Sequence, residues 1–309
     1  MVLRRGEDHP KFVEGPDLSS RRLELGHLES LTHVELDTAL TGGRGGVALV
    51  LGGCLSALPV LSSLILHGDA AKIQCCLSLD NSSIGFTNLQ SLSLKYKSPP
   101  DPFLGMRPLF SYFASRFPKL HSLSLENVGD DDSNMEAKHT WENILELKPR
   151  LMRKLILHNI PLKLGTRGIT TLLATWPQLE ELSLHPPISS KGVYQAQLIF
   201  THIYFYNLTL RTLGLPLEFS GLKDPLIVSS SVIPKSNSKL TQLNLFKPDN
   251  PLLAVKEKLG VVRNLLVFFP KLSVIRGSDT ASDLTTDLQA ILDTFHDMGL
   301  TTLTQSTRK

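Results

Sequence analysis

The stretch FPKLHSLSL, residues 117–125, joins an aromatic residue, a proline and three leucines in a pattern that the chain uses again. FPKLSVI at residues 269–275 and WPQLEELSL at residues 176–184 are near copies. In general form, an apolar residue is followed by leucine-like residues at the fourth, seventh and ninth positions, and one of the nine copies has an extra residue. A period of this size is typical of proteins built from stacked repeats. The seventh positions lie 27 to 32 residues apart and are Val34, Leu64, Leu92, Leu123, Leu155, Leu182, Leu213, Leu243 and Ile275.

Each copy predicts a short strand that is preceded by a helix. The final Leu-x-Leu has a period of two, so both leucines lie on one side of an extended segment. Ahead of it, apolar residues follow helical spacing, as at Phe110, Phe113 and Phe117. The aromatic residue is then the last core-facing residue of the helix, and the proline after it ends the helix. The same spacing predicts helices ending at Leu58, Trp176, Asn207 and Phe269, and another around residues 141–145.

Units of this kind cannot bury their apolar faces alone, so they must stack on one another. Right-handed connections between parallel strands place all strands on one surface and all helices on the other. The sequence therefore predicts an α/β leucine-rich repeat solenoid of about nine repeats, a horseshoe with parallel strands on the concave face and helices on the convex face. Residues 70–85 show no clear helical stripe and residues 226–239 are rich in serine, so loops are expected in both.

The predicted organisation has three parts. Residues 1–27 contain no repeat and form an N-terminal extension or incomplete cap, and residues 28–282 form the leucine-rich repeat domain. Residues 283–309 form a C-terminal capping helix and a loose tail, because Leu284, Leu288 and Leu292 share one helix face before the sequence becomes polar. The acidic residues 129–143 read as an exposed loop leading into a helix, or as a loop that docks a partner.

Composition excludes several classes of protein. Lys and Arg number 32 against 29 Asp and Glu, which gives a net charge of +3 without a local basic stripe, so no nucleic-acid partner is expected. The 3 cysteines, Cys54, Cys75 and Cys76, fit neither a disulfide framework nor zinc spacing. There is no signal peptide and no apolar run of about 18 residues. An intracellular protein, cytoplasmic or nuclear and without a membrane partner, is expected.

Motifs for catalysis are missing from the sequence. It contains no G-x-S-x-G, H-E-x-x-H or GxxxxGK[ST] pattern. The glycine cluster TGGRGG at residues 41–46 falls where the first strand should lead into the first helix, so a flexible turn is a better interpretation than a phosphate cradle. We therefore predict no enzyme activity and no cofactor.

A binding surface is predicted on the side of the strands opposite the leucines. Its residues are mixed in type, with few basic ones, which suits a protein partner better than a phosphate backbone. His158 and His185 end consecutive predicted strands and are expected to be neighbours, but the adjoining positions supply at most one carboxylate, so no metal site is predicted. The predicted partner-binding residues are Glu35, Asp37, His67, Lys95, Glu126, His158, His185, Asn244, Phe246 and Arg276.

The copies that enter through Phe117, Trp176 and Phe269 resemble the leucine-rich repeats of the ribonuclease-inhibitor-like superfamily. Their irregular spacing resembles the C-terminal repeat region of fungal F-box proteins, and the resemblance covers about residues 28–298. It implies a scaffold that recruits a protein target, as the substrate-receptor part of a cullin-based ubiquitin ligase adaptor that lacks a recognisable F-box. The alternative is an enzyme regulator on the same scaffold, such as a GTPase activator.

Overall fold

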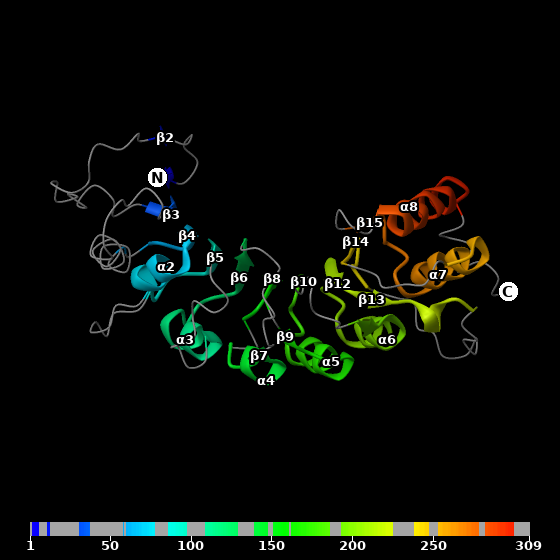
Figure 1. Cartoon of the computed structure of the whole chain (residues 1–309), viewed down its shortest axis with the longest axis horizontal. Coiled ribbons are helices and arrows are strands. Elements are labelled where there is room, and N and C mark those ends of the chain that lie inside the picture. The colour runs from blue at the N-terminus through cyan, green and yellow to red at the C-terminus, as the bar shows by residue number, and fades with distance from the viewer. Residues whose placement is uncertain are drawn as a thin grey trace. The chain divides into compact units, whose positions relative to one another are not determined.

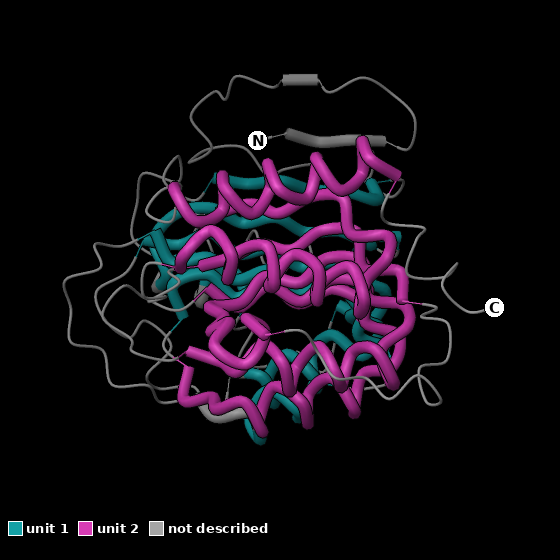
Figure 2. Tube along the Cα trace, turned by 90° about the vertical axis from the view of Figure 1, so that its right-hand side faces the viewer, with its two compact units in different colours: residues 1–136, 142–152, 157–160 teal, residues 137–141, 153–156, 161–309 magenta. Residues whose placement is uncertain are grey.

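The computed structural model describes residues 2–5, 11–12, 31–37, 58, 60–77, 86–97, 109–128, 139–147, 151–160, 162–185, 193–224, 238–246, 253–277 and 282–299. The chain forms two compact units (Figure 2). Unit 1 comprises residues 1–136, 142–152 and 157–160, and unit 2 comprises residues 137–141, 153–156 and 161–309. The predicted helix at residues 51–57, the glycine cluster, most of the acidic loop and residues 225–237 lie outside the described residues.

Unit 1 is built on a sheet whose parallel strands carry the repeated leucines. Val34, Leu64, Leu92 and Leu123 pair with one another across neighbouring strands, which confirms the predicted register. Two further strands pair antiparallel at the N-terminal edge of this sheet, within residues 1–27 where no repeat was predicted. In spatial order the strands are β2 (Lys11–Phe12), β1 (Val2–Arg5), β3 (Leu31–Asp37), β4 (Ser63–Asp69), β5 (Ser91–Lys97) and β6 (Ser122–Asn127) (Figure 1).

Two helices of unit 1 cover the leucine side of these strands. Helix α3 (Leu109–Arg116) is the one predicted ahead of Phe117. Helix α2 (Ala70–Leu77) contradicts the loop expected at residues 70–85. Ala70, Ile73 and Cys76 are buried and lie three residues apart, so they do form a stripe, but alanine and cysteine make it weak in the sequence. The helix also follows β4 directly, and the backbone N–H of Lys72 donates to the Asp69 carboxylate at 3.3 Å.

Unit 2 repeats the same arrangement. Leu182, Leu213, Leu243 and Ile275 pair across its parallel strands in the predicted register. The strands are β10 (Glu181–His185), β12 (Thr212–Leu215), β14 (Gln242–Leu245) and β15 (Val274–Gly277). Strand β8 (Lys154–His158) contributes residues 154–156 to unit 2 and residues 157–158 to unit 1. Each of the nine copies therefore contains a described strand.

The predicted helices of unit 2 are confirmed, and they lie along one side of its strands (Figure 1). The N–H of Trp176 closes one helix on Leu172 O, the N–H of Phe269 closes another on Leu265 O, and a proline follows each aromatic residue. The helices are α5 (Thr166–Thr175), α6 (Ala196–Tyr206), α7 (Val255–Phe268) and α8 (Ser282–Asp297), with the single turn η3 (Ser220–Leu222). The single turn α4 (Trp141–Ile144) forms where a helix was predicted, with residue 141 in unit 2 and residues 142–144 in unit 1.

Two small parallel ladders were not predicted. Each joins two strands of only two residues, which are too short to show a period in the sequence. They pair β7 (His139–Thr140) with β9 (Leu162–Lys163), and β11 (Tyr194–Gln195) with β13 (Leu217–Glu218).

The repeated F/W-P-x-L sequence forms a tight turn between helix and strand. The carbonyl of the aromatic residue accepts the N–H of the leucine three residues later, at 3.0 Å from Leu120 to Phe117 and 2.9 Å from Leu272 to Phe269. Proline suits the second position of such a turn because its φ angle is already fixed there. The turn therefore ends the helix and places the first leucine of the next strand.

Asn207 replaces the aromatic residue in one turn of unit 2. Its side chain is fully buried, and Nδ2 donates to the carbonyl oxygens of Leu173 at 2.7 Å and Trp176 at 3.5 Å. Those carbonyls belong to the end of α5, where the helix leaves oxygens without partners of its own. The polar residue thus ties the turn after α6 to the turn after α5, a role that its place in the sequence pattern did not show.

Helix α8 packs on α7 and on β15 at the C-terminal end of unit 2. Leu288 and Leu292 are fully buried, as the predicted helix face requires. Gln289 lies at the outer edge of β15, where its Oε1 accepts the N–H of Ile275 and its Nε2 donates to Ser273 O at 3.3 Å. The helix is confirmed, whereas the three predicted domain boundaries stay predictions.

The start of α7 yields a prediction about pH. Ala254 offers no side-chain acceptor there, and the Glu257 carboxylate accepts the backbone N–H of Ala254 at 2.8 Å and pairs with Lys223 at 3.2 Å. These contacts, the backbone bond first, hold the pKa of Glu257 below its ordinary value of 4.5. A pKa lowered by folding adds stability above the unfolded-state pKa, and this stability is lost as pH falls through the folded-state pKa.

We expect Glu257→Gln to lower the melting temperature at pH 7, because glutamine keeps the hydrogen bond but loses the charge. The difference between the two proteins should shrink as the pH drops below about 4.5 and vanish once Glu257 is protonated. Thermal unfolding followed by circular dichroism at several pH values measures it. A difference that stays constant down to the acid limit would show that the charge of Glu257 adds nothing.

Candidate functional site

The strand face of unit 1 presents one row of ionisable side chains in direct register. Asp37 pairs with His67, His67 with Lys95, and Lys95 with Glu126 on the adjacent strands β3 to β6. Each of them follows the second leucine of its copy, and because strand residues alternate in direction, they point away from the buried leucines. The structure thus brings together four residues of the predicted binding surface.

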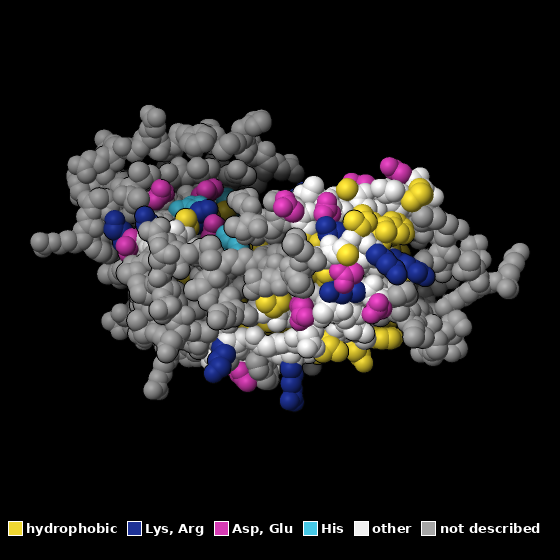
Figure 3. Space-filling model, turned by 45° about the vertical axis from the view of Figure 1, so that its right-hand side comes forward, with side chains coloured by type: hydrophobic (Ala, Val, Ile, Leu, Met, Phe, Trp, Pro, Cys, Tyr) yellow, Lys and Arg dark blue, Asp and Glu magenta, His cyan; other side chains and the backbone are white. Residues whose placement is uncertain are grey.

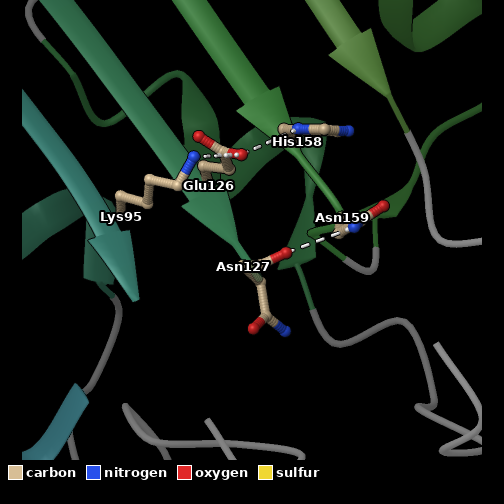
Figure 4. Close-up of polar contacts among 5 residues, drawn as sticks. All are labelled: Lys95, Glu126, Asn127, His158 and Asn159. Atoms are coloured by element: carbon tan, nitrogen blue, oxygen red, sulfur yellow. Dashed lines mark hydrogen bonds and ion pairs between the residues drawn. The ribbon is translucent and has the colours of Figure 1, made fainter. Parts of the chain in front are cut away.

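Ion pairs link this row and extend it. His67 Nε2 lies 3.2 Å from Glu35 Oε1, and Lys95 Nζ lies 3.1 Å from Glu126 Oε1. The same oxygen of Glu126 lies 3.6 Å from His158 Nδ1 (Figure 4). These side chains are 32% to 43% exposed, so each pair contributes little to stability. Their effect is to hold the charged groups in fixed positions on rigid strands.

The segment after β8 is held by a residue that the sequence analysis did not select. Asn159 has a φ of 54°, in the left-handed region that asparagine tolerates better than most residues. Its Nδ2 donates to the backbone oxygen of Asn127 at 3.2 Å, at the end of β6 (Figure 4). Asn159 therefore fixes the chain next to His158, beside the carboxylate of Glu126.

The charge of this surface is negative when its histidines are neutral. Glu35, Asp37 and Glu126 supply three negative charges against one positive charge from Lys95, which leaves two in excess. Acidic, basic and histidine side chains lie close together on this part of the molecule (Figure 3). A ligand with complementary basic groups is favoured there on electrostatic grounds.

The strand face of unit 2 has an aromatic character instead. The rings of His185 and Phe246 stack with centroids 4.4 Å apart and planes at 11°. His185 is the last residue of β10, and Phe246 directly follows β14; these two strands flank β12, whose Gly214 pairs in register with Ser183 and Asn244. A Cβ at Gly214 would come within 2.6 Å of Ser183 Oγ and 2.7 Å of a Phe246 ring atom. Glycine therefore allows the two rings to meet over the middle strand.

One residue of this face is less accessible than strand alternation alone indicates. Ser183 lies on the side opposite the leucines, but it is only 8% exposed, and its Oγ lies beside Gly214. His158 lies beside Glu126, and His185 stacks on Phe246. That His158 and His185 are neighbours stays a prediction.

The remaining predicted residues of unit 2 flank this stack. Asn244 pairs in register with Arg276, and its Oδ1 accepts a hydrogen bond from Gln242 Nε2 at 2.9 Å. Arg276 is exposed at the end of the sheet. In the part of the chain that the structure describes, no group of three or more His, Cys, Asp or Glu residues could hold a metal ion.

Comparisons with known proteins add little to this description. No protein-family model and no curated protein sequence matches the chain. Among solved structures, the chain is similar to the crystal structure of the leucine-rich repeat-containing protein LegL7 from Legionella pneumophila. The identity is 15% and the TM-score 0.44, over 85% of this chain and 82% of that one. None of the described helices is both long and apolar enough to span a membrane. The repeated strands, turns and helices described above are features of this chain itself.

Proposed function

We propose that the chain is a non-catalytic scaffold that recognises a protein partner through the strand face of its leucine-rich repeats. The row Asp37, His67, Lys95 and Glu126, in register on four adjacent strands, carries this proposal. Side chains on a rigid sheet lose little conformational entropy on binding, and ion pairs that already exist reduce that loss further. The surface is therefore suited to recognition without rearrangement.

The chemistry of the row favours a basic segment of a partner protein. Together with the adjacent Glu35, the row has an excess of two negative charges, which repels phosphate groups and attracts lysine and arginine side chains. Half-buried Ile65 lies on the same face, in register between Glu35 and Ser93, and supplies an apolar contact among the charges. Charged groups around an apolar contact are typical of protein interfaces that form and dissociate.

Charge reversal on the strand face tests the proposal. The full chain is immobilised, partners are captured and identified by mass spectrometry, and the affinity of each is then measured with purified proteins. We expect Asp37→Lys combined with Glu126→Lys to weaken binding by about tenfold or more, because like charges then face each other. The affinity of the unchanged protein should also fall as salt is added.

A matched control changes the same charges elsewhere in unit 1. Glu142→Lys combined with Glu146→Lys alters two exposed carboxylates on and just after α4. This variant should bind like the unchanged protein. If both pairs of substitutions weaken binding equally, or neither does, the strand face is not the recognition surface. Far-UV circular dichroism verifies that both variants remain folded.

Narrower versions of the proposal come from the resemblance to F-box proteins. They comprise a horseshoe-shaped solenoid, an intracellular location and the substrate-receptor role in a ubiquitin ligase. Co-precipitation of the full chain with a cullin-ligase adaptor subunit tests the last of these. The alternative of a GTPase activator requires stimulation of GTP hydrolysis across a panel of GTPases. No residue described here has a geometry that favours the activator over the scaffold.

A further inference from the structure

Helix α6 is apolar on two opposite sides. No Asp, Glu, Lys or Arg occurs from residue 194 to residue 210, a stretch that contains the whole helix. Ile199, Phe200 and Ile203 are fully buried on the inner side. A helix on the outside of a repeat protein needs only this one apolar stripe, and its other side is normally polar.

The outer side of α6 exposes large hydrophobic residues. Leu198 is 54% exposed, Phe205 50% and Tyr206 65%, and Leu208 follows in the next turn at 39%. Leu198 and Tyr206 are eight residues apart with His202 midway, so the three lie on one stripe of the helix. Hydrophobic side chains are visible on the helix side of unit 2 in the space-filling view (Figure 3).

The neighbouring helices of unit 2 differ from α6 in charge. Arg167 is exposed on α5, and Lys256 and Arg263 are exposed on α7. Each of these helices thus has an ordinary solvated side. The uncharged outer side distinguishes α6 from these two helices, and it includes the imidazole of His202, which packs against the Tyr206 ring with centroids 4.8 Å apart and planes tilted by 40°.

The exposed area is large enough for a modest interface. A buried aromatic side chain covers 150–250 Å², so two that are about half exposed, together with two leucines, leave roughly 300–400 Å² of apolar surface. Patches of about this size on soluble proteins often have a function. Two such patches together fall short of the 1,200 Å² of a stable complex and fit a weak, concentration-dependent one.

We propose that this outer side of α6 is where two copies of the chain associate, through a two-fold symmetric contact between their α6 helices. A two-fold interface must be complementary to itself, and a charged patch would repel its own copy. The uncharged, apolar surface meets this condition. If the helices cross antiparallel at His202, Leu198 of one copy lies opposite Tyr206 of the other, because both are four residues from the crossing point.

Substitutions on the outer side of α6 test the dimer. We expect the average mass of the unchanged protein to rise with concentration in sedimentation equilibrium, and Leu198→Lys combined with Tyr206→Lys to shift the dissociation constant by at least about tenfold. Met298→Lys is the matched control, since Met298 is 57% exposed at the end of α8, and it should leave association unchanged. Monomers at every concentration, or dimers that resist the double substitution, would overturn the proposal.

Cross-linking gives a second measurement that does not depend on weakening a helix. In a chain whose 3 native cysteines are replaced by alanine, His202→Cys should form a disulfide-linked dimer under mild oxidation. Met298→Cys should remain monomeric. Equal cross-linking of the two variants would reject the crossing point, and binding of the monomer to lipid vesicles or to a different protein through Leu198 and Tyr206 would reject a second copy as the occupant. The result does not bear on the strand-face proposal.

Discussion

Trp176→Ala is expected to lower the free energy of unfolding by about 3–5 kcal/mol. Trp176 is fully buried in unit 2, at the turn between α5 and β10, and it is the largest fully buried side chain among the described residues. Its removal would leave a cavity beneath the turn, and the N–H that closes α5 on Leu172 would lose the packing that holds it in place. Chemical denaturation followed by circular dichroism measures the loss.

Trp176→Phe is the informative comparison. The indole Nε1 is buried without a hydrogen-bond partner among the described residues, so tryptophan carries a cost that phenylalanine would not. Phe117 and Phe269 occupy the same position of the pattern in other copies, which shows that the turn accepts phenylalanine. We expect the free energy of unfolding to fall by well under half as much in Trp176→Phe as in Trp176→Ala. Equal losses would mean that the cavity does not determine the effect.

The second large loss of stability is expected when an inward-facing leucine of a strand is shortened. Leu182 is fully buried in β10 and pairs with Leu213 of β12, so Leu182→Ala should cost about 2–5 kcal/mol. The adjacent Ser183 lies on the other face of the same strand. It lacks a large side chain to lose, and Ser183→Ala should cost less than about 1 kcal/mol even though the residue is mostly buried. If urea unfolding showed equal losses for the two variants, the assignment of inward and outward positions would be wrong.

The strands and their register could be predicted because the signal is local and repeated. A leucine pair such as Leu123 and Leu125 fixes the direction of its own strand, and seven similar apolar pairs in other copies then fix which residues lie side by side. Helix α2 was missed because Ala70 and Cys76 contribute little to a hydrophobic stripe. The antiparallel pairing of β1 with β3 depends on contacts between segments that share no pattern.

The candidate site was predictable to the same extent. Register alone placed Asp37, His67, Lys95 and Glu126 in one row. It could not show that one oxygen of Glu126 faces both Lys95 and His158, because side-chain rotamers decide such contacts. The stack of His185 on Phe246 was also beyond it. That contact depends on Gly214 of the intervening strand, because a side chain there would clash with the Phe246 ring. The register shows which residues are adjacent, but it does not show that two rings can meet above a glycine.

The amide of Gln289 has a consequence for solubility. A parallel ladder has no natural end, since its last strand offers backbone groups to any further strand that arrives, including one from another molecule. By occupying the N–H of Ile275 and the oxygen of Ser273, the side chain takes two of these groups out of reach, and the ring of His296 takes up Leu272 O nearby. Helix α8 thereby blocks the edge strand β15 from pairing with strands of other molecules, which would otherwise lead to fibres.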